Sequence, residues 1–222
     1  MNTVLVCVVL VALAVATAAQ DPASSWLSYA EYSADDSITF LAANWTVPAY
    51  PSDKFASRAP GFWISVENAD NTYLVQPILA FGDGDLHYTC FNGWFVWSGP
   101  HAGWHQSQAF KVVPGDAIYA SITYLPSTDE YEMYIACEAK GQSVTTKVPA
   151  QGVKYPLSYF VVEHQSSCSG LPADGKVTWT NIEVEVANNR VTPTWQAKQE
   201  DPVCSSQAHI LSPSSIQVTW DA

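Results

Sequence analysis

The chain has 222 residues, of which 48% are hydrophobic and 13% aromatic, and its formal net charge is −12. This much apolar material closes a sizeable single core, which excludes an intrinsically disordered protein. A charged fraction of only 14%, together with 9 Trp and 11 Tyr, favours β-strands over helical bundles and coiled coils. Contacts with phosphate backbones or anionic headgroups need Lys or Arg, so neither nucleic acid nor a membrane is an expected partner.

The first residues predict an export signal. Val4–Val15 is a nearly unbroken apolar run, and the small residues Ala16, Thr17 and Ala18 follow it. The run is shorter than the ~20 residues of a membrane span, and the small-x-small pattern is typical of a cleavage site. We expect residues 1–19 to be removed and residues 20–222 to form one domain. The mature protein is then secreted outside the cell, or reaches an acidic lytic compartment by the same route.

Five cysteines are present, and Cys7 would be removed with the signal peptide. Export takes the other four into an oxidising compartment, where two disulfides are the default expectation. No C-x-x-C metal motif is present among them, and all three possible pairings stay open. The four cysteines are Cys90, Cys137, Cys168 and Cys204. Asn44 opens an Asn-Trp-Thr sequon, which predicts a glycosylation site in a secreted protein.

Short segments that alternate apolar and polar residues follow along the chain. Residues 118–124 and 131–137 alternate with a period of two, and residues 126–129 join them as a hairpin. Residues 182–186 alternate in the same way, and residues 216–220 predict a closing strand. No segment has convincing helical periodicity over more than about two turns. The pattern predicts an all-β domain, a single antiparallel β-sandwich of the jelly-roll kind.

The common catalytic and metal-binding motifs are absent: the sequence has no G-x-S-x-G, no Walker loop, no G-x-G-x-x-G and no H-E-x-x-H. His101 and His105 have the spacing of a metal pair, but they lack the accompanying glutamate, and a loop histidine pair is the simpler interpretation. An acidic cluster without EF-hand spacing is interpreted as a solvated rim. It consists of Glu67, Asp70, Asp83 and Asp85. We expect neither a metal nor a cofactor.

Two polar residues stand inside apolar strands. Gln76 interrupts Tyr73–Leu79, and Glu163 follows the apolar run Tyr159–Val162. A carboxylate among apolar neighbours suits general acid or base work. On physical grounds alone, however, each is more simply an ordinary, partly exposed strand residue.

Eight short segments, in order and with nearly matching spacing, carry a resemblance to a known family. They are Asn44–Pro48, Gly61–Glu67, Leu74–Gln76, Trp94–Trp97, Val113–Ile118, Gly141–Thr145, Tyr159–His164 and Ala173–Asn181. Through these segments the chain resembles the eqolisins, a family of glutamic endopeptidases. The resemblance implies a β-sandwich of two curved antiparallel sheets, which agrees with the strand pattern.

The resemblance also implies a catalytic dyad, Gln76 and Glu163. We expect the two residues on neighbouring strands of one sheet, with their side chains on the same concave face. Glu163 would take a proton from the water that attacks the peptide carbonyl, and the Gln76 amide would stabilise the oxyanion. The substrate would be a protein or peptide and the enzyme a monomer. The implied substrate-binding residues are Trp63, Glu67, Trp94 and Trp97.

The sequence also departs from the family pattern. Val96 stands where the family has a glutamate, His164 where it has an aspartate, and Glu67 is one methylene longer than the family's aspartate. A fold can persist without its activity, so a second hypothesis is an inactive secreted β-sandwich that binds carbohydrate or peptide through exposed tryptophans. A structural secreted or matrix protein is a third.

Overall fold

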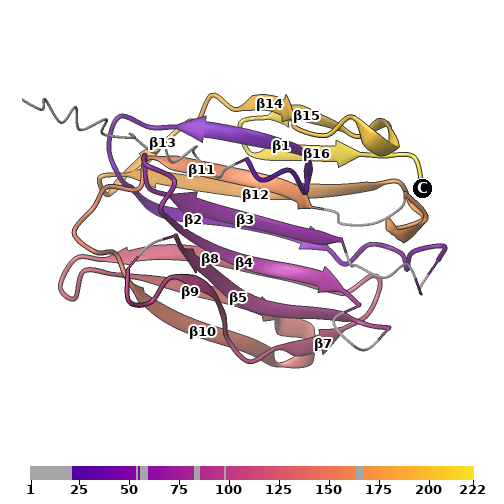
Figure 1. Ribbon diagram of the computed structural model, residues 1–222, viewed down its shortest axis with the longest axis horizontal. Coiled ribbons are helices and arrows are strands. Elements are labelled where there is room, and N and C mark those ends of the chain that lie inside the picture. Colours follow the sequence, from indigo (N-terminus) through magenta and orange to yellow (C-terminus); the bar gives the residue numbers. More distant parts are fainter. Residues whose placement is uncertain (1–21, 54, 56–59, 83–85, 98, 164–167) are drawn as a thin grey trace, which may run out of the picture.

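The computed structural model describes residues 22–222, apart from residues 54, 56–59, 83–85, 98 and 164–167. The predicted signal peptide, Asp83, Asp85 and His164 therefore lie outside the described residues. The structure is 60% strand and 5% helix, arranged as two antiparallel sheets (Figure 1). The prediction of an all-β sandwich is confirmed. Within the described part of the chain, no helix has the length and hydrophobicity that crossing a membrane requires.

The first sheet contains the strands on which Gln76 and Glu163 lie. Its order is β14 (Gln196–Gln199), β1 (Trp26–Ser33), β11 (Leu157–Glu163), β3 (Gly61–Glu67), β4 (Tyr73–Phe81), β5 (Tyr88–Val96) and β6 (Gly103–Gln106), with β7 (Phe110–Val112) also paired to β5. Strands far apart in the sequence are thus neighbours, since β11 lies between β1 and β3.

The second sheet forms the other layer. Its order is β10 (Gln142–Pro149), β9 (Glu130–Cys137), β8 (Ala117–Leu125), β2 (Ile38–Thr46), β12 (Lys176–Val186), β16 (Ser215–Thr219) and β15 (Gln207–Ser212), with β13 (Asn189–Val191) paired to β12. Strands β8 and β9 form the predicted hairpin, because Leu125 pairs with Glu130. The described residues also contain three short 3₁₀ helices: η1 (Glu138–Lys140), η2 (Cys168–Gly170) and η3 (Val203–Ser205).

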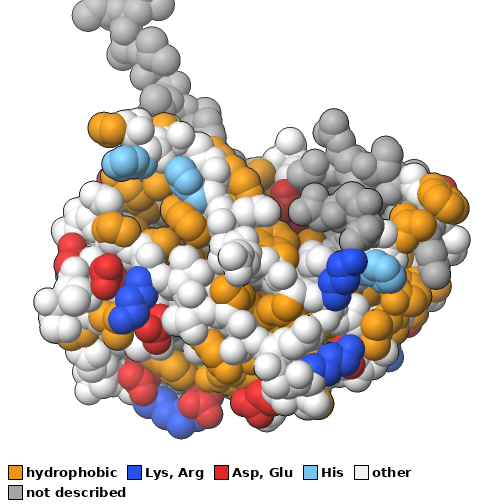
Figure 2. Space-filling model, turned by 90° about the horizontal axis from the view of Figure 1, so that it is seen from below, with side chains coloured by type: hydrophobic (Ala, Val, Ile, Leu, Met, Phe, Trp, Pro, Cys, Tyr) orange, Lys and Arg blue, Asp and Glu red, His pale blue; other side chains and the backbone are white. Residues whose placement is uncertain are grey.

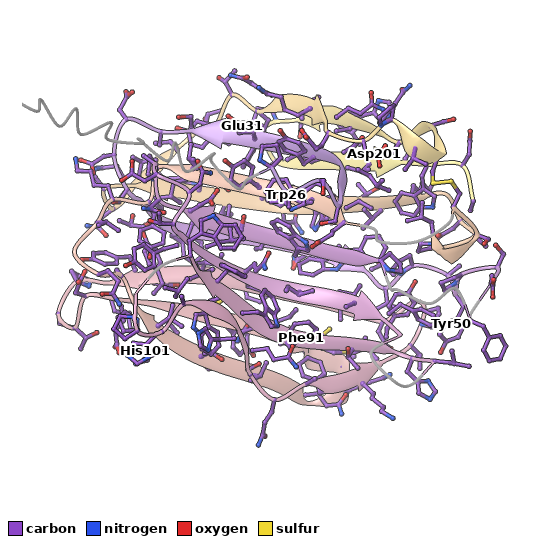
Figure 3. All side chains as sticks on the ribbon, viewed as in Figure 1. Trp26, Glu31, Tyr50, Phe91, His101 and Asp201 are labelled. Atoms are coloured by element: carbon purple, nitrogen blue, oxygen red, sulfur yellow. A yellow bond between two sulfur atoms is a disulfide. The ribbon has the colours of Figure 1, made fainter. Side chains whose placement is uncertain are left out.

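The first sheet buries side chains on both of its faces. The inner faces of the two sheets enclose the main core, to which β3 contributes Phe62, Ile64 and Val66. Because side chains alternate along a strand, Trp63 projects to the other side, which we call the outer face of the first sheet. A separate hydrophobic cluster forms there from Trp26, Tyr29, Trp63, Ile78, Phe91, Tyr159 and Val161. Figure 3 places Trp26 and Phe91 over this sheet.

The cysteines correct one prediction. Cys168 and Cys204 form a disulfide that connects η2 to η3. Cys90 and Cys137 are instead free thiols, and both are completely buried. They lie on β5 and β9, in different sheets, where each packs in the core as a small apolar side chain. Burial raises the pKa of the Cys90 thiol well above its ordinary value, and the nearby Cys137 adds to the effect. The prediction that all four cysteines are oxidised is therefore wrong for this pair.

Candidate active site

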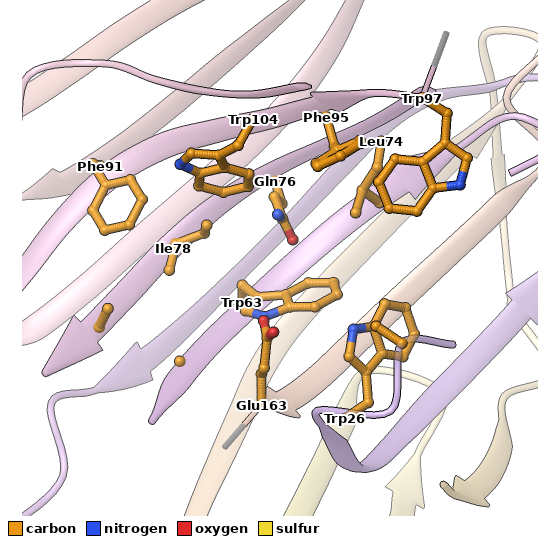
Figure 4. Close-up of a pocket in the computed structure, with 13 residues that line it drawn as sticks. Trp26, Trp63, Leu74, Gln76, Ile78, Phe91, Phe95, Trp97, Trp104 and Glu163 are labelled. Atoms are coloured by element: carbon orange, nitrogen blue, oxygen red, sulfur yellow. The ribbon is translucent and has the colours of Figure 1, made fainter. Parts of the chain in front are cut away.

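A pocket of about 360 Å³ opens on the outer face of the first sheet. Its walls are mostly aromatic and aliphatic, and of the described residues that line it, Gln76 contributes the one carboxamide and Glu163 the one carboxylate (Figure 4). The lining residues are Ala23, Trp26, Gly61, Trp63, Leu74, Gln76, Ile78, Ala80, Phe91, Phe95, Trp97, Trp104 and Glu163. Figure 2 shows the same character from outside, with hydrophobic side chains gathered around a hollow.

Gln76 and Glu163 face each other across one intervening strand. Gln76 lies in the middle of β4 and Glu163 is the last residue of β11, and β3 runs between these two strands. The expectation of neighbouring strands is therefore wrong, whereas the expectation of one sheet and one face is correct. Adjacent strands are ~4.8 Å apart, so strands β4 and β11 are about 10 Å apart. The two residues are also offset along β3, because Glu163 pairs with Gly61 whereas Gln76 lies opposite Ser65. The side chains point toward one another over Trp63 (Figure 4).

Both oxygens of Glu163 accept hydrogen bonds. Ser25 Oγ donates to Oε1 over 2.7 Å, and the indole Nε1 of Trp63 donates to Oε2 over 3.2 Å. Ser25 comes just before β1, whose first residue, Trp26, pairs with Glu163. The β1–β11 register shifts between Trp26 and Ser28. The two donors hold the carboxylate in one orientation at the wall of the pocket.

Gln76 is enclosed more tightly, with only 4% of its surface exposed. Gly93 pairs with it on β5, and the Trp104 ring lies over this glycine. A Cβ atom at position 93 would stand 2.3 Å from Trp104 Cη2 and 2.9 Å from Ile78 Cδ1. Position 93 therefore has to be glycine for Trp104 to close this side of the pocket. The amide oxygen of Gln76 has no hydrogen-bond partner among the described residues.

Edge-to-face aromatic contacts build the walls of the pocket. The ring centroids of Trp26 lie 4.9 Å from Trp63 and 5.1 Å from Tyr159. Trp97 meets Phe95 edge-on at 3.7 Å. Such contacts add stability beyond the area that they bury, so these rings hold fixed positions around Gln76 and Glu163.

Two residues predicted to bind substrate lie elsewhere. Trp94 follows Gly93, which pairs with Gln76, and adjacent residues on a strand point to opposite faces. It stacks on His105 at 5.3 Å beside a second cavity of about 260 Å³, on the other side of β5. Glu67 is completely buried at the end of β3 and accepts a 3.0 Å hydrogen bond from Asn71 Nδ2. The prediction that Trp94 and Glu67 line the substrate pocket is corrected on these grounds.

The histidine pair is part of a loop and a short strand. His105 Nε2 lies 2.9 Å from the carbonyl oxygen of His101, and since a carbonyl only accepts, Nε2 carries the proton there. Across the described residues no three His, Cys, Asp or Glu side chains are grouped closely enough to hold a metal ion. Asn44, at the predicted sequon, lies on β2 with its side chain partly exposed.

Sequence reasoning missed several residues of the site. Alternation from Trp97 back along β5 would have indicated Phe95, Gly93 and Phe91 as one face. Ser25 and Trp26 carried no comparable signal, since they reach Glu163 only because β1 pairs with a strand far along the chain.

The model of the peptidase A4 family matches residues 25–220. The chain belongs to the peptidase A4 family. These are the eqolisins, so the predicted family is confirmed, and with it the assignment of the chain as a glutamic endopeptidase. No curated protein sequence matches the chain.

Solved structures of this family share the fold. Scytalidoglutamic peptidase, bound to a transition state analogue inhibitor, superposes with a TM-score of 0.66 at 16% identity, covering 88% of this chain and 98% of that one. SCP-B, an eqolisin in complex with the tripeptide Ala-Ile-His, has a TM-score of 0.62 at 16% identity, over 89% of this chain and 98% of that one. Aspergilloglutamic peptidase from Aspergillus niger has a TM-score of 0.53 at 20% identity, over 74% and 99%.

Proposed function

We propose that this eqolisin is a secreted acid endopeptidase in which Glu163 and Gln76 form the catalytic dyad. The observation that carries the proposal is the pocket itself. Two residues separated by 87 positions supply a carboxylate and a carboxamide, the only such groups among the described residues that line it. They reach into it from opposite sides. A general base and an oxyanion donor need this arrangement.

The reaction follows from the roles of these two groups. Ionised Glu163 accepts a proton from a water molecule while the water oxygen attacks the carbonyl carbon of the scissile peptide bond. The Gln76 amide donates a hydrogen bond to the oxyanion that forms. Protonated Glu163 then gives its proton to the amide nitrogen as the C–N bond breaks. Atoms and charge balance, and no covalent intermediate forms with the protein.

Ser25 and Trp63 are positioning residues in this scheme. Each donates to one oxygen of Glu163, and each oxygen keeps a second lone pair for the attacking water. Fixing a base before the reaction removes the entropic cost of orienting it in the transition state.

The substrate is a peptide segment with apolar side chains beside the scissile bond, since aromatic rings surround the dyad. Related structures contain a transition state analogue and a tripeptide, which supports a peptide ligand here as well. Cleavage of residues 1–19 on export would leave Ala23 and Ser25 close to the new amino terminus, at the edge of the pocket.

The test is to incubate the purified mature protein with a denatured protein substrate across the acidic pH range. Cleavage should be greatest at acidic pH and should resist inhibitors of serine, cysteine and metallopeptidases, because the scheme uses neither a nucleophilic side chain nor a metal. Gln76→Ala should lower kcat by about 10²- to 10³-fold, as loss of an oxyanion donor does elsewhere, with the fold unchanged by circular dichroism. An inactive wild-type protein would overturn the proposal.

The aromatic walls also support the binding-module hypothesis, because Trp26, Trp63, Trp97 and Trp104 all face one pocket. Titrating peptides and oligosaccharides against tryptophan fluorescence separates the two functions. A module binds its ligand and leaves it intact, whereas the peptidase converts a bound peptide to products.

A further inference from the structure

A buried serine lies directly beside the proposed oxyanion donor. Ser65 is on β3, two residues from Trp63 and therefore on the same outer face, and none of its surface is exposed. Trp63 pairs with Ile78 and Val66 pairs with Val75. This constant register places Ser65 opposite Gln76. Directly opposed residues of antiparallel strands have Cβ atoms ~4.5–5.5 Å apart.

Both side chains carry an unsatisfied atom. Ser65 Oγ and Gln76 Oε1 are buried, and among the residues that the structure describes neither has a hydrogen-bond partner. A buried polar atom without a partner destabilises the fold, so such an atom calls for an explanation. The two groups are complementary, because a hydroxyl can donate and an amide oxygen can only accept.

The direction of the Gln76 amide matters for the proposed reaction. An oxyanion needs the Nε2 hydrogens, and an amide that presents its oxygen instead would repel the developing negative charge. A donor on the β3 side that holds Oε1 leaves Nε2 to face the bound carbonyl. The aromatic and aliphatic neighbours of Gln76, namely Trp104 and Ile78 near Gly93, offer no hydroxyl for this purpose.

We propose that Ser65 is a positioning residue, whose Oγ–H donates to Gln76 Oε1 in the substrate complex and so fixes Nε2 as the oxyanion donor. The inference rests on the proposed function and deepens it. It requires only a rotation of the Ser65 hydroxyl and a small change in the Gln76 side-chain torsions, because the two residues already face each other across adjacent strands.

A second serine provides a matched control. Ser158 on β11 is as completely buried as Ser65, and its Oγ is likewise without a partner in the described chain. Its neighbours Leu157 and Tyr159 belong to the outer face, so Ser158 faces the core between the sheets. Ser65→Ala and Ser158→Ala therefore remove the same buried hydroxyl, and only Ser65→Ala removes it beside Gln76.

The experiment measures kcat and KM on a peptide substrate at acidic pH. Ser65→Ala should lower kcat about tenfold, the effect of one lost hydrogen bond, with KM nearly unchanged. Ser158→Ala should keep wild-type kinetics. Ser65→Cys keeps the shape of the side chain, with a larger sulfur atom in place of the oxygen, but donates only weakly, so it should lose at least as much activity as Ser65→Ala. Both alanine variants should unfold at or above the wild-type temperature, because each removes an unsatisfied hydroxyl.

A double-mutant cycle shows whether Ser65 acts through Gln76. In the Gln76→Ala background, Ser65→Ala should cause no further loss of kcat. The same tenfold loss in both backgrounds would overturn the inference, as would a Ser65→Ala variant as active as Ser158→Ala. Either result leaves the proposed function intact if the wild-type protein cleaves peptides. An inactive wild-type protein would overturn both.

Discussion

Ser25 and Glu163 are 138 positions apart in the sequence, yet the Ser25 hydroxyl donates a 2.7 Å hydrogen bond to Oε1 of the glutamate. The contact exists because β1 pairs antiparallel with β11 and brings Trp26 opposite Glu163. Ser25, which precedes β1, therefore contributes a hydrogen-bond donor to the site that residues of β3, β4 and β11 line.

Removing this contact should impair catalysis with little effect on the fold. A hydrogen bond to a charged group is stronger than a neutral one, so Ser25→Ala is expected to lower kcat about tenfold, whereas Ser25→Thr, which keeps the hydroxyl, should retain most of it. Ser24→Ala is the control, since Ser24 is the adjacent residue and is exposed. Steady-state kinetics check the prediction, and equal kcat values for Ser25→Ala and Ser24→Ala would count against a positioning role.

Gly93→Ala should alter substrate binding more than stability. Its new methyl group would stand 2.3 Å from the far end of the Trp104 ring, which has to swing away and open that wall of the pocket. We expect a raised KM and a destabilisation of about 1–3 kcal/mol, the usual cost of overpacking. Gly61→Ala is the control. Gly61 lines the same pocket, but a methyl group there would meet no atom closer than 3.4 Å. An unchanged KM in Gly93→Ala would show that Trp104 does not contact substrate.

The free thiols can be counted directly. The mature chain without reduction should incorporate no alkylating reagent while folded and two equivalents once denatured, at Cys90 and Cys137, because both are completely buried. The raised pKa of the Cys90 thiol further disfavours its reactive thiolate. Mass spectrometry of the alkylated peptides measures this outcome. A Cys90–Cys137 disulfide in the purified protein would contradict it.

Buried tyrosines should make the fold sensitive to alkali. Burial raises the pKa of Tyr29 to about 12, and it raises the pKa values of Tyr88, Tyr131 and Tyr155 further. The unfolded chain therefore loses these protons first, near pH ~10. Their contribution to stability is complete below that pH and is lost as pH rises through the higher folded pKa values, by up to about 1.4 kcal/mol per pH unit for each group.

Denaturant unfolding from about pH 8 to pH 12 measures this loss. Tyr131→Phe should make the free energy of unfolding fall less steeply with pH above pH ~10, because Tyr131 is buried and its hydroxyl donates to the Ile38 carbonyl over 2.8 Å. Tyr119→Phe, on the same sheet and not buried, is the control and should leave the slope unchanged. A free energy of unfolding that stays flat above pH ~10 would contradict the assignment.

The sequence predicted the fold class, and the placing of Gln76 and Glu163 on one face of one sheet, better than it predicted the rest of the pocket. Alternation identified strands such as 118–124, and Gln76 and Glu163 stood out because each is polar within an apolar run. The prediction for Trp94 is wrong because it assigns both tryptophans of the segment Trp94–Trp97 to one pocket. In the structure Trp97 lines the pocket of Gln76 and Glu163, whereas Trp94 lines the second cavity. The order of strands in the sheet, which puts β3 between the dyad residues and brings Ser25 to Glu163, depends on long-range pairing that no local pattern encodes.

The central claim is that Glu163 is the general base, and the activity of Glu163→Gln tests it most directly. The variant keeps the shape of the side chain, and its amide oxygen can still accept from Ser25 or Trp63, but it cannot take a proton from water. We predict that cleavage of a denatured protein at acidic pH falls by at least about 10³-fold, with circular dichroism and unfolding temperature like those of the wild type. A Glu163→Gln protein that folds and keeps wild-type proteolysis would contradict the account.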